Sequence, residues 1–314
     1  MRCVTAVLRT SVHSYFIRAF AAERGVRSHP SYLSYMPTTL ERLTIGLRRH
    51  PVRFAIEVGV SLSAMWSLIE PAQAFLQLSL GGWPRFSVLL VAAVLIGAWR
   101  AMPSDSKTAR IPGTTSCITI QYSDLFAERG VIAVPVNDFY DSAIGPHVSA
   151  RSVHGQTIAH LFNGDGSAFE KAVDASLAGI PYQVVTRTSG RSHCYPIGTT
   201  AYLGIGRPNI LAFVLTNTDL NTLKVEADVP KMWKALHGLW ETARVHCNDT
   251  PLALPLVGGA LAGVGLSPQH LLSLIVMSAA SETRQKRICA DIRICLIPAL
   301  RGQTDIDAAF QLLN

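Results

Sequence analysis

The segment PLALPLVGGALAGVGLSPQHLLSLIVM, residues 251–277, decides the fold class of this 314-residue chain. Residues 252–257 are typical of a buried strand, a glycine-rich turn follows, and residues 267–281 have the apolar spacing of a helix. A strand, a turn and a helix in this order place backbone N–H groups at a helix N-terminus, where the helix dipole favours an anion. Because glycine lacks a Cβ atom, a ligand can approach such a turn closely.

The turn matches neither of the two common nucleotide-binding signatures. No lysine follows Gly263 as in a Walker A sequence, and the spacing is not G-x-G-x-x-G. Since the turn has no charged side chain, it would bind phosphate through its amides alone. That chemistry suits a diphosphate within a nucleotide better than a triphosphate with Mg²⁺. A tight packing turn between the strand and the helix is the alternative interpretation.

The rest of the C-terminal two thirds alternates strands with helices. The spacing of apolar residues predicts strands at 117–122, 131–136 and 288–297, a hairpin of 202–206 with 209–215, a helix at 228–246, and a last helix with Thr304 or Asp305 near its cap. This alternation predicts an α/β sandwich with a mostly parallel, buried sheet.

The net charge of +7 is confined to the first third of the chain. Residues 1–110 carry 13 Lys and Arg against 5 Asp and Glu, whereas residues 111–314 carry 15 against 16. A nearly neutral globular region lacks the basic face of a nucleic-acid binder, so we expect no nucleic-acid partner. The six cysteines form no C-x-x-C pair, and we expect neither a metal site nor a disulfide framework.

Two apolar stretches, residues 54–70 and 86–99, precede the globular region. Arginines flank both stretches, Trp83 and Trp99 stand where interfacial residues are expected, and the connection carries little charge. The positive-inside rule then predicts a two-helix transmembrane hairpin over residues 51–101, with both ends in the cytoplasm. A buried helical hairpin of a soluble protein is the alternative.

The flanking regions and one acid need interpretations of their own. We expect residues 1–50 to be an N-terminal cytoplasmic segment, residues 102–115 a polar linker, and residues 116–314 the globular domain. A carboxylate within a membrane span is costly. Glu57 therefore either lines a pore or an oligomer interface, or lies near the headgroups about one turn from Arg53.

Polar or small residues stand at the ends of several expected strands. The segments concerned are YSDLF (122–126), VNDFYDS (136–142), SVHGQTI (152–158) and YPIGTT (195–200). Ligands of open α/β folds collect at such strand ends. Each residue also has a plainer interpretation, because Asp and Asn are common in caps and turns.

Together these segments resemble a macro domain, the fold that binds ADP-ribose, over roughly residues 116–314. The resemblance implies a three-layer α/β/α sandwich with a mixed sheet. It also implies that Asp124 accepts the adenine amino group, that Asn137 faces the distal ribose, and that residues 258–264 cradle the diphosphate. The expected ligand-binding residues are Asp124, Leu125, Phe126, Asn137, Phe139, Asp141, Ser152, His154, Thr199, Thr200, Gly258, Gly259, Ala260, Leu261, Ala262, Gly263 and Val264.

Some of these residues have two possible roles. Phe126 stacks on the base or belongs to the core, and Phe139 walls the distal ribose. Asp141 is expected to pair with an ammonium group on the ligand. His154 hydrogen-bonds a carboxylate or the ribose, or is structural. The hydroxyls of Thr199 and Thr200 either face the phosphates or pack in the sheet.

Behind two expected membrane helices, the same motifs resemble the membrane-anchored macro effectors of Thoeris anti-phage defence. That resemblance implies a signal derived from ADP-ribose, such as histidine-ADP-ribose, made by a TIR-domain partner. Binding of the signal would make the chain form homo-oligomers and disrupt the bacterial inner membrane, with the macro domain in the cytoplasm. Phage replication would stop because the host dies or is arrested.

The chain is expected to be a sensor and not an enzyme, without catalytic residues, cofactor or metal. Macro hydrolases follow the Asn with a second Asn and a run of glycines, which NDFYDSAIGPHVSARSVHG lacks. We also see no general base with a clear proton to move. The alternatives are a membrane-tethered ADP-ribosyl hydrolase, and an anchor that recruits partners through its α/β domain.

Overall fold

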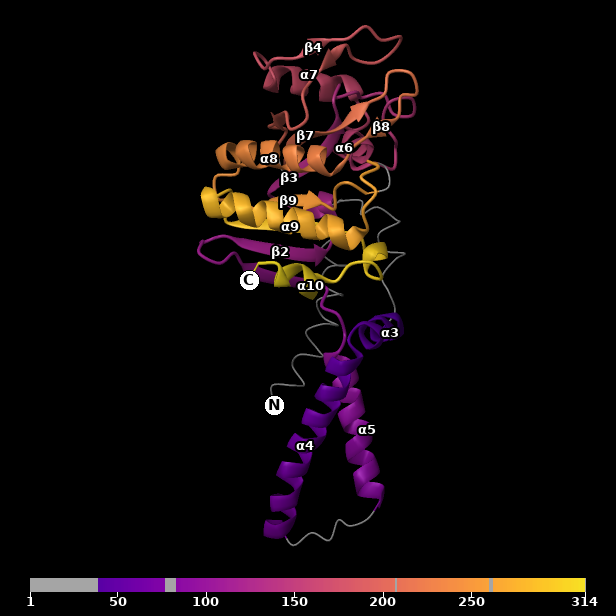
Figure 1. Cartoon of the computed structure of the whole chain (residues 1–314), viewed down its shortest axis with the longest axis vertical. Helices are drawn as coiled ribbons and strands as arrows, with labels where there is room; N and C mark the ends of the chain where they lie inside the picture. The colour runs from indigo at the N-terminus through magenta and orange to yellow at the C-terminus, as the bar shows by residue number, and fades with distance from the viewer. Residues whose placement is uncertain (1–38, 77–82, 207, 260–261, 314) are drawn as a thin grey trace.

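A computed structural model describes residues 39–76, 83–206, 208–259 and 262–313 of the chain (Figure 1). Most of the expected N-terminal segment, 1–50, lies outside the described residues. The described part has a hairpin of two long helices at one end and an α/β domain at the other, with a short helix between them (Figure 1).

The domain is built on an eight-stranded mixed sheet within the described residues, with the path β1-β2-β10-β9-β3-β7-β6 and β8 added to β7. Strands β2, β10, β9, β3 and β7 run parallel to one another, while β1, β6 and β8 are antiparallel to their neighbours. The strands are β1 (Ser106–Arg110), β2 (Cys117–Tyr122), β3 (Val131–Asn137), β6 (Thr200–Leu203), β7 (Asn209–Thr218), β8 (Val225–Glu226), β9 (Leu252–Pro255) and β10 (Asp291–Leu296).

Helices cover both faces of the sheet and make a three-layer sandwich (Figure 1). One face carries α8 (Val229–His246), α9 (Pro268–Gln285) and α10 (Ile306–Gln311), and the other carries α6 (Val153–Leu161) and α7 (Gly166–Ser176). The strands bury both of their faces, because successive side chains point to opposite sides. In β3, for example, Val131 and Ala133 belong to the first core, while Ile132, Val134 and Val136 belong to the second.

The predicted fold class and its main elements are confirmed. The parallel strands and the three helices on the α8 face lie where the apolar spacing places them. The β6–β7 hairpin is present, but β6 spans Thr200–Leu203 and not the predicted residues 202–206. Asp305 caps α10 by accepting a hydrogen bond from the Ala308 amide. Two predicted strands are shorter than expected: β9 ends at Pro255 and β10 begins at Asp291.

The predicted linker, residues 102–115, needs correction because it contains strand β1. Its sequence SKTAR is polar because β1 is an edge strand with mostly exposed side chains, so composition alone does not distinguish it from a linker. The elements η1 (Leu125–Ala127), η2 (Pro298–Leu300), α7 and the small hairpin of β4 (Gln183–Val184) with β5 (His193–Cys194) were not predicted.

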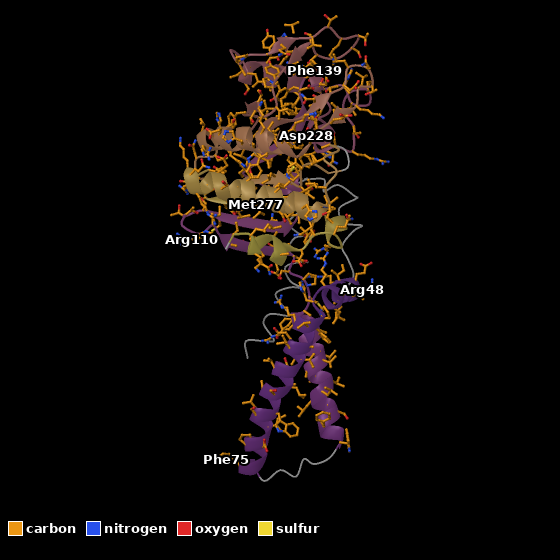
Figure 2. The ribbon with its side chains drawn as sticks, viewed as in Figure 1. Arg48, Phe75, Arg110, Phe139, Asp228 and Met277 are labelled. Carbon is orange, nitrogen blue, oxygen red and sulfur yellow. The ribbon has the colours of Figure 1, made fainter. Side chains whose placement is uncertain are left out.

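The helical module comprises α3 (Thr39–Arg49), α4 (Pro51–Leu76) and α5 (Trp83–Arg100). Helices α4 and α5 form a hairpin that projects from the domain, with Phe75 exposed at its far end (Figure 2). The two helices touch closely at Gly97, where a Cβ atom would lie 2.6 Å from Val58 Cγ2. Near the domain, Arg100 and Glu57 form an ion pair of 3.0 Å across the hairpin.

The hairpin is apolar and largely uncovered. The stretch Pro51–Pro71 is long and apolar enough to cross a membrane, and only 6% of its most apolar 18 residues are buried within the structure. The apolar stretch of the second helix, Phe86–Arg100, is shorter. The exposed large side chains of α5 include Trp83, Val88, Val91, Leu95 and Trp99. A core helix of a soluble protein would instead bury most of these side chains.

Close packing of α8 against the turn that precedes β6 predicts an unusual substitution effect at Gly238. Alanine normally stabilises a helix by about 1 kcal/mol relative to glycine. A Cβ atom at Gly238 would instead overlap the backbone of Gly198, lying 2.7 Å from its carbonyl carbon. We therefore expect Gly238→Ala to lower the melting temperature of the detergent-solubilised chain. Gly204→Ala is the control, because its Cβ would make only an ordinary contact of 3.6 Å with Tyr202. Equal melting temperatures for the two variants would contradict the packing.

Candidate binding site

One edge of the sheet brings together the segments that the sequence predicts to bind a ligand. Strands β2, β9 and β3 are parallel, so their carboxyl ends meet at this edge. Strand β6 runs antiparallel to β7 and therefore begins there. Helices α8 and α9 have their N-termini at the same edge, which Asp228 marks in Figure 2. The polar strand-end residues are thus gathered as predicted.

Asp124 follows β2 and caps the short helix η1. Its Oδ1 accepts a hydrogen bond of 3.0 Å from the Phe126 amide, which is the plainer role weighed for it. Among the described residues, its second oxygen accepts no hydrogen bond and the side chain is half-buried. Leu125 is buried in the core, and the Phe126 ring lies 5.6 Å from that of His160. Asp124 can therefore cap η1 and accept a further hydrogen bond at once.

Asn137 ends β3 and is locked into a ring of hydrogen bonds with Asp141. The Asn137 Nδ2 donates to Asp141 Oδ2 at 2.9 Å, and the Asp141 amide donates to Asn137 Oδ1 at 3.0 Å. Both side chains are buried. The turn between them forces Tyr140 into the left-handed region, with φ of 52°. Tyr140 is held there because its hydroxyl donates to the Thr199 carbonyl at 2.9 Å.

The Asp141 carboxylate is enclosed by the loop that joins β4 to β5. Arg187 Nη1 donates to both of its oxygens, at 3.0 and 3.1 Å, and the Arg191 amide donates to Oδ1 at 3.0 Å. The side chains of Arg187 and Asp141 are 3% and 1% exposed. The Arg187 guanidinium lies 4.0 Å from the centre of the buried Phe139 ring. A Cβ atom at Gly190 would lie 2.6 Å from Asp141 Oδ1, so the loop needs glycine there.

The sequence did not point to Arg187, which is 46 positions from its partner. In this arrangement Asp141 orients Asn137, and a ligand ammonium group would have to displace Arg187 to reach it. Pairing of Asp141 with a ligand stays a prediction. Buried charges are rarely left unpaired. A buried acid without a basic residue close to it in the sequence therefore indicates a distant basic partner, which here is Arg187.

A second buried acid, Asp138, fastens β3 to the end of β7. Its carboxylate accepts hydrogen bonds from the Thr218 amide and hydroxyl at 3.1 and 2.7 Å, and from Asn217 Nδ2 at 3.2 Å. Cys194 Sγ lies 3.6 Å from the same carboxylate. Burial, and then the Asp138 charge, raise the pKa of the Cys194 thiol to about 11. This thiol is therefore protonated, and a poor nucleophile, at neutral pH.

Ser152 and His154 lie at the start of α6. Ser152 caps the helix by accepting from the Gly155 amide at 3.0 Å, and its hydroxyl donates to the Ser149 carbonyl at 2.6 Å. His154 is buried against Phe169, and its Nε2 has no hydrogen-bond partner among the described residues. Burial lowers the pKa of His154 to about 4. At neutral pH this imidazole is uncharged.

The glycine-rich turn after β9 combines both interpretations of its glycines. Gly258 has a φ of 84°, and a Cβ atom there would lie 3.0 Å from side-chain atoms of Leu271 and Met232, so it is a packing residue. At Gly259 and Gly263 no atom of the described residues, apart from each glycine and its chain neighbours, lies within 4 Å of the Cβ position, and the φ of Gly263 is 71°.

Hydrogen bonds fix the shape of this turn on the side of α8. The Gly259 carbonyl accepts from the amides of Ala262 and Gly263 at 2.9 and 3.1 Å. The Ala262 carbonyl accepts from Ala227 at 2.9 Å. Val264 is half-buried and packs against the core. Ala260 and Leu261 lie outside the described residues.

Thr199 and Thr200 close the far side of the site. The Thr199 carbonyl accepts from both Tyr140 and the Val214 amide, and the Thr200 hydroxyl donates to the Gly198 carbonyl at 3.0 Å. These contacts tie the start of β6 to the 137–141 turn. For Thr200, the hydroxyl is engaged within the protein, which matches the packing role weighed for it.

Away from this edge, α8 and α9 carry His237, Glu241 and Glu282, whose ligand atoms lie within 4.8 Å of one another. Arg244 forms ion pairs with both glutamates, and His237 Nδ1 lies 2.6 Å from Glu282. The guanidinium thus already pairs with one oxygen of each carboxylate. The group therefore acts as an ion-pair network that joins the two helices.

A three-layer sandwich on this mixed sheet, with its polar edge at the strand ends, defines a macro domain. Residues 118–297, more than half of the chain, match the family model described as Thoeris protein ThsA, Macro domain. The chain belongs to this family. The search of curated proteins found no match.

Several solved macrodomain structures are similar to the chain. The Oceanobacillus iheyensis macrodomain with ADP has 12% identity and a TM-score of 0.44, covering 66% of this chain and 93% of that one. The same macrodomain with MES has 11% identity and a TM-score of 0.43, covering 66% and 93%. The Trypanosoma brucei macrodomain in complex with ADP-ribose has 10% identity and a TM-score of 0.38, covering 64% and 70%.

The buried ion pair predicts a measurable stability effect. Removing one partner leaves the other charge buried without compensation, which typically costs at least about 3 kcal/mol. We expect Arg187→Gln to lower the free energy of unfolding by that order. The double variant Arg187→Gln with Asp141→Asn should lose less, because no charge is left unpaired. Urea denaturation measures both. A double variant less stable than the single one would contradict the pairing.

The pKa of His154 predicts a pH effect of defined sign. The unfolded pKa is near 6.5 and the folded pKa is about 4, so the unfolded chain binds more protons between these values. This contribution to stability is complete above about pH 6.5 and is lost as the pH falls towards 4. His154→Gln removes it. We expect the stability advantage of the wild type over the variant to shrink by about 2 kcal/mol between pH 7 and pH 5. An advantage that stays constant over this interval would show that His154 is not protonated differently in the two states.

Proposed function

We propose that the chain is a membrane-anchored sensor whose macro domain binds a derivative of ADP-ribose. The observation that carries the proposal is the gathering of Asp124, Asn137 and the glycine-rich turn at one edge of a ThsA-type macro domain. Macrodomain structures similar to this one contain ADP or ADP-ribose, which is consistent with a ligand of this class.

Each part of the nucleotide has a chemical partner at this edge. The unused oxygen of Asp124 can accept a hydrogen bond from the adenine amino group, and a carboxylate makes the stronger, charge-assisted kind. The amides of Gly258 and Gly259 donate to no described residue and can bind the diphosphate, whereas those of Ala262 and Gly263 already donate to the Gly259 carbonyl. The N-terminus of α9 adds a favourable dipole, although Pro268 has no N–H and Ser267 accepts from the His270 amide. Asn137 uses one of its two side-chain N–H groups and one lone pair of its carbonyl oxygen to bind Asp141. The second N–H and the other lone pair are left for a ribose hydroxyl.

The α4–α5 hairpin would anchor the sensor in the bacterial inner membrane. Large apolar side chains cover its surface, and a patch of this extent on a soluble protein would be a liability. The Glu57–Arg100 ion pair lies towards the domain, where headgroups would be, and this supports the headgroup interpretation of Glu57. The macro domain would then lie in the cytoplasm.

In this proposal a TIR-domain partner makes the signal, such as histidine-ADP-ribose, during phage infection. Binding brings copies of the chain together, and the clustered hairpins disrupt the membrane. A ligand can drive such a change only if it binds the assembled and separate states with different affinity. The family match to ThsA supports a role in anti-phage defence.

Catalysis is not part of the proposal. Near the edge, Cys194 is held protonated, His154 is buried and neutral, and Asp141 is already paired with Arg187. None of these groups is set up to activate a nucleophile. Incubation with ADP-ribosylated protein that released ADP-ribose would identify the chain as a hydrolase instead.

Binding is tested by comparing two helix-capping aspartates. Asp124 caps η1, and Asp165 caps α7 through the same kind of contact, accepting from the Ala168 amide at 3.0 Å. We expect Asp124→Ala to weaken ADP-ribose binding roughly tenfold or more in calorimetry, since a hydrogen bond to a charged group is lost. Asp165→Ala should bind as the wild type does. Equal affinities for both variants would remove Asp124 from the site.

A further inference from the structure

The chain segment from Leu300 to Asp307, which precedes and begins α10, contacts the helical module. Arg49, the last residue of α3, donates from both terminal nitrogens to backbone carbonyls of this segment, at 2.6 Å to Thr304 and at 2.6 Å to Arg301. We call residues 300–307 the relay segment. Because main-chain oxygens accept these bonds, a shift of the backbone at Thr304 or Arg301 would change the contacts of Arg49 directly.

Two more basic side chains at the start of the hairpin contact the relay segment. His50 Nε2 lies 3.3 Å from the Asp305 carboxylate, and Arg53 Nη1 lies 3.4 Å from that of Asp307. His50 stands between α3 and α4, and Arg53 lies in the first turn of α4. The attachment therefore covers the point where the helical module turns into the hairpin.

The relay segment is also bound to the β2 side of the proposed nucleotide site. The hydroxyl of Tyr122 lies 2.8 Å from Thr304 Oγ1 and donates to the Thr304 carbonyl at 3.2 Å. The Arg301 guanidinium lies 4.3 Å from the centre of the Tyr122 ring. Tyr122 is the last residue of β2, two positions before Asp124.

The glycine-turn side of the site is bound to the same residues. Gln269 lies in the first turn of α9, the helix that follows the glycine-rich turn along the chain. Its Oε1 accepts from the Asp305 amide at 2.6 Å, and its Nε2 donates to the Asp305 carbonyl at 3.3 Å. Both parts of the site that would hold the adenine and the diphosphate are thus joined to Thr304 and Asp305.

We propose that the relay segment couples ligand binding to the helical hairpin, an inference that rests on the proposed function. A ligand that spans Asp124 and the glycine-rich turn fixes the end of β2 relative to the start of α9. Tyr122 and Gln269 hold adjacent residues of the relay segment, so a change in that spacing moves Thr304 against Asp305. Arg49 and His50 bind these two residues from the other side and carry the movement to α3 and α4.

Reciprocity makes the coupling measurable as an affinity. If ligand binding alters the contact of Arg49 with the relay segment, then loss of that contact alters ligand affinity by the same factor. We expect Arg49→Gln in the full-length chain in detergent to change the dissociation constant of ADP-ribose at least about fivefold, although Arg49 belongs to none of the ligand-binding segments. Arg48→Gln is the matched control. Its side chain is exposed on the neighbouring position of α3 and makes no ion pair with a described residue (Figure 2).

Amide hydrogen exchange provides a second readout that a purely structural contact would not move. In the wild type, ADP-ribose should change exchange in the glycine-rich turn and also in α3. In Gln269→Ala, the change in the glycine-rich turn should persist while the change in α3 is reduced. The coupling would be overturned, and the proposed function left intact, by two results together. The wild type and both arginine variants would bind ADP-ribose with equal affinity, and exchange in α3 would not change. A wild type that shows no binding heat with ADP-ribose would reject the proposed function and this inference together.

Discussion

Parallel pairing of β2, β10, β9, β3 and β7 is the constraint on which the rest of the domain depends. It sends every one of these strands towards the same edge, so the loops that follow them share one region of space. It also requires helices on both faces, because parallel strands expose apolar side chains on each side. The polar edge and the two buried cores are two results of one backbone arrangement.

At that edge, buried carboxylates hold the loops in place before any ligand arrives. Asp138 joins β3 to β7, and Asp141 joins Asn137 to the β4–β5 loop through Arg187. Charged groups with their hydrogen bonds satisfied can fix a loop more firmly than apolar contacts, because each bond has a direction. The amide of Asn137 is therefore oriented in advance, which lowers the entropy lost when a ligand binds.

Local signals in the sequence predicted much of this structure. The strand, glycine-rich turn and helix around residues 251–277 are present, and Asp305 caps the last helix. What could not be predicted depends on contacts between distant residues. Arg187 has a structural role only because it pairs with Asp141, and Gly258 is a packing residue only because Leu271 and Met232 lie beside it. An edge strand such as β1 has the composition of a linker, since half of its environment is water.

The short connection between α5 and β1 also limits the distance between the macro domain and the hairpin. Helix α5 ends at Arg100 and β1 begins at Ser106, so five residues join them. Five extended residues reach roughly 17 Å at most. So short a connection limits how far the domain can move relative to the hairpin. If two copies of the domain associated, their hairpins would be brought together with them, and the local concentration of one hairpin around the other would be very high.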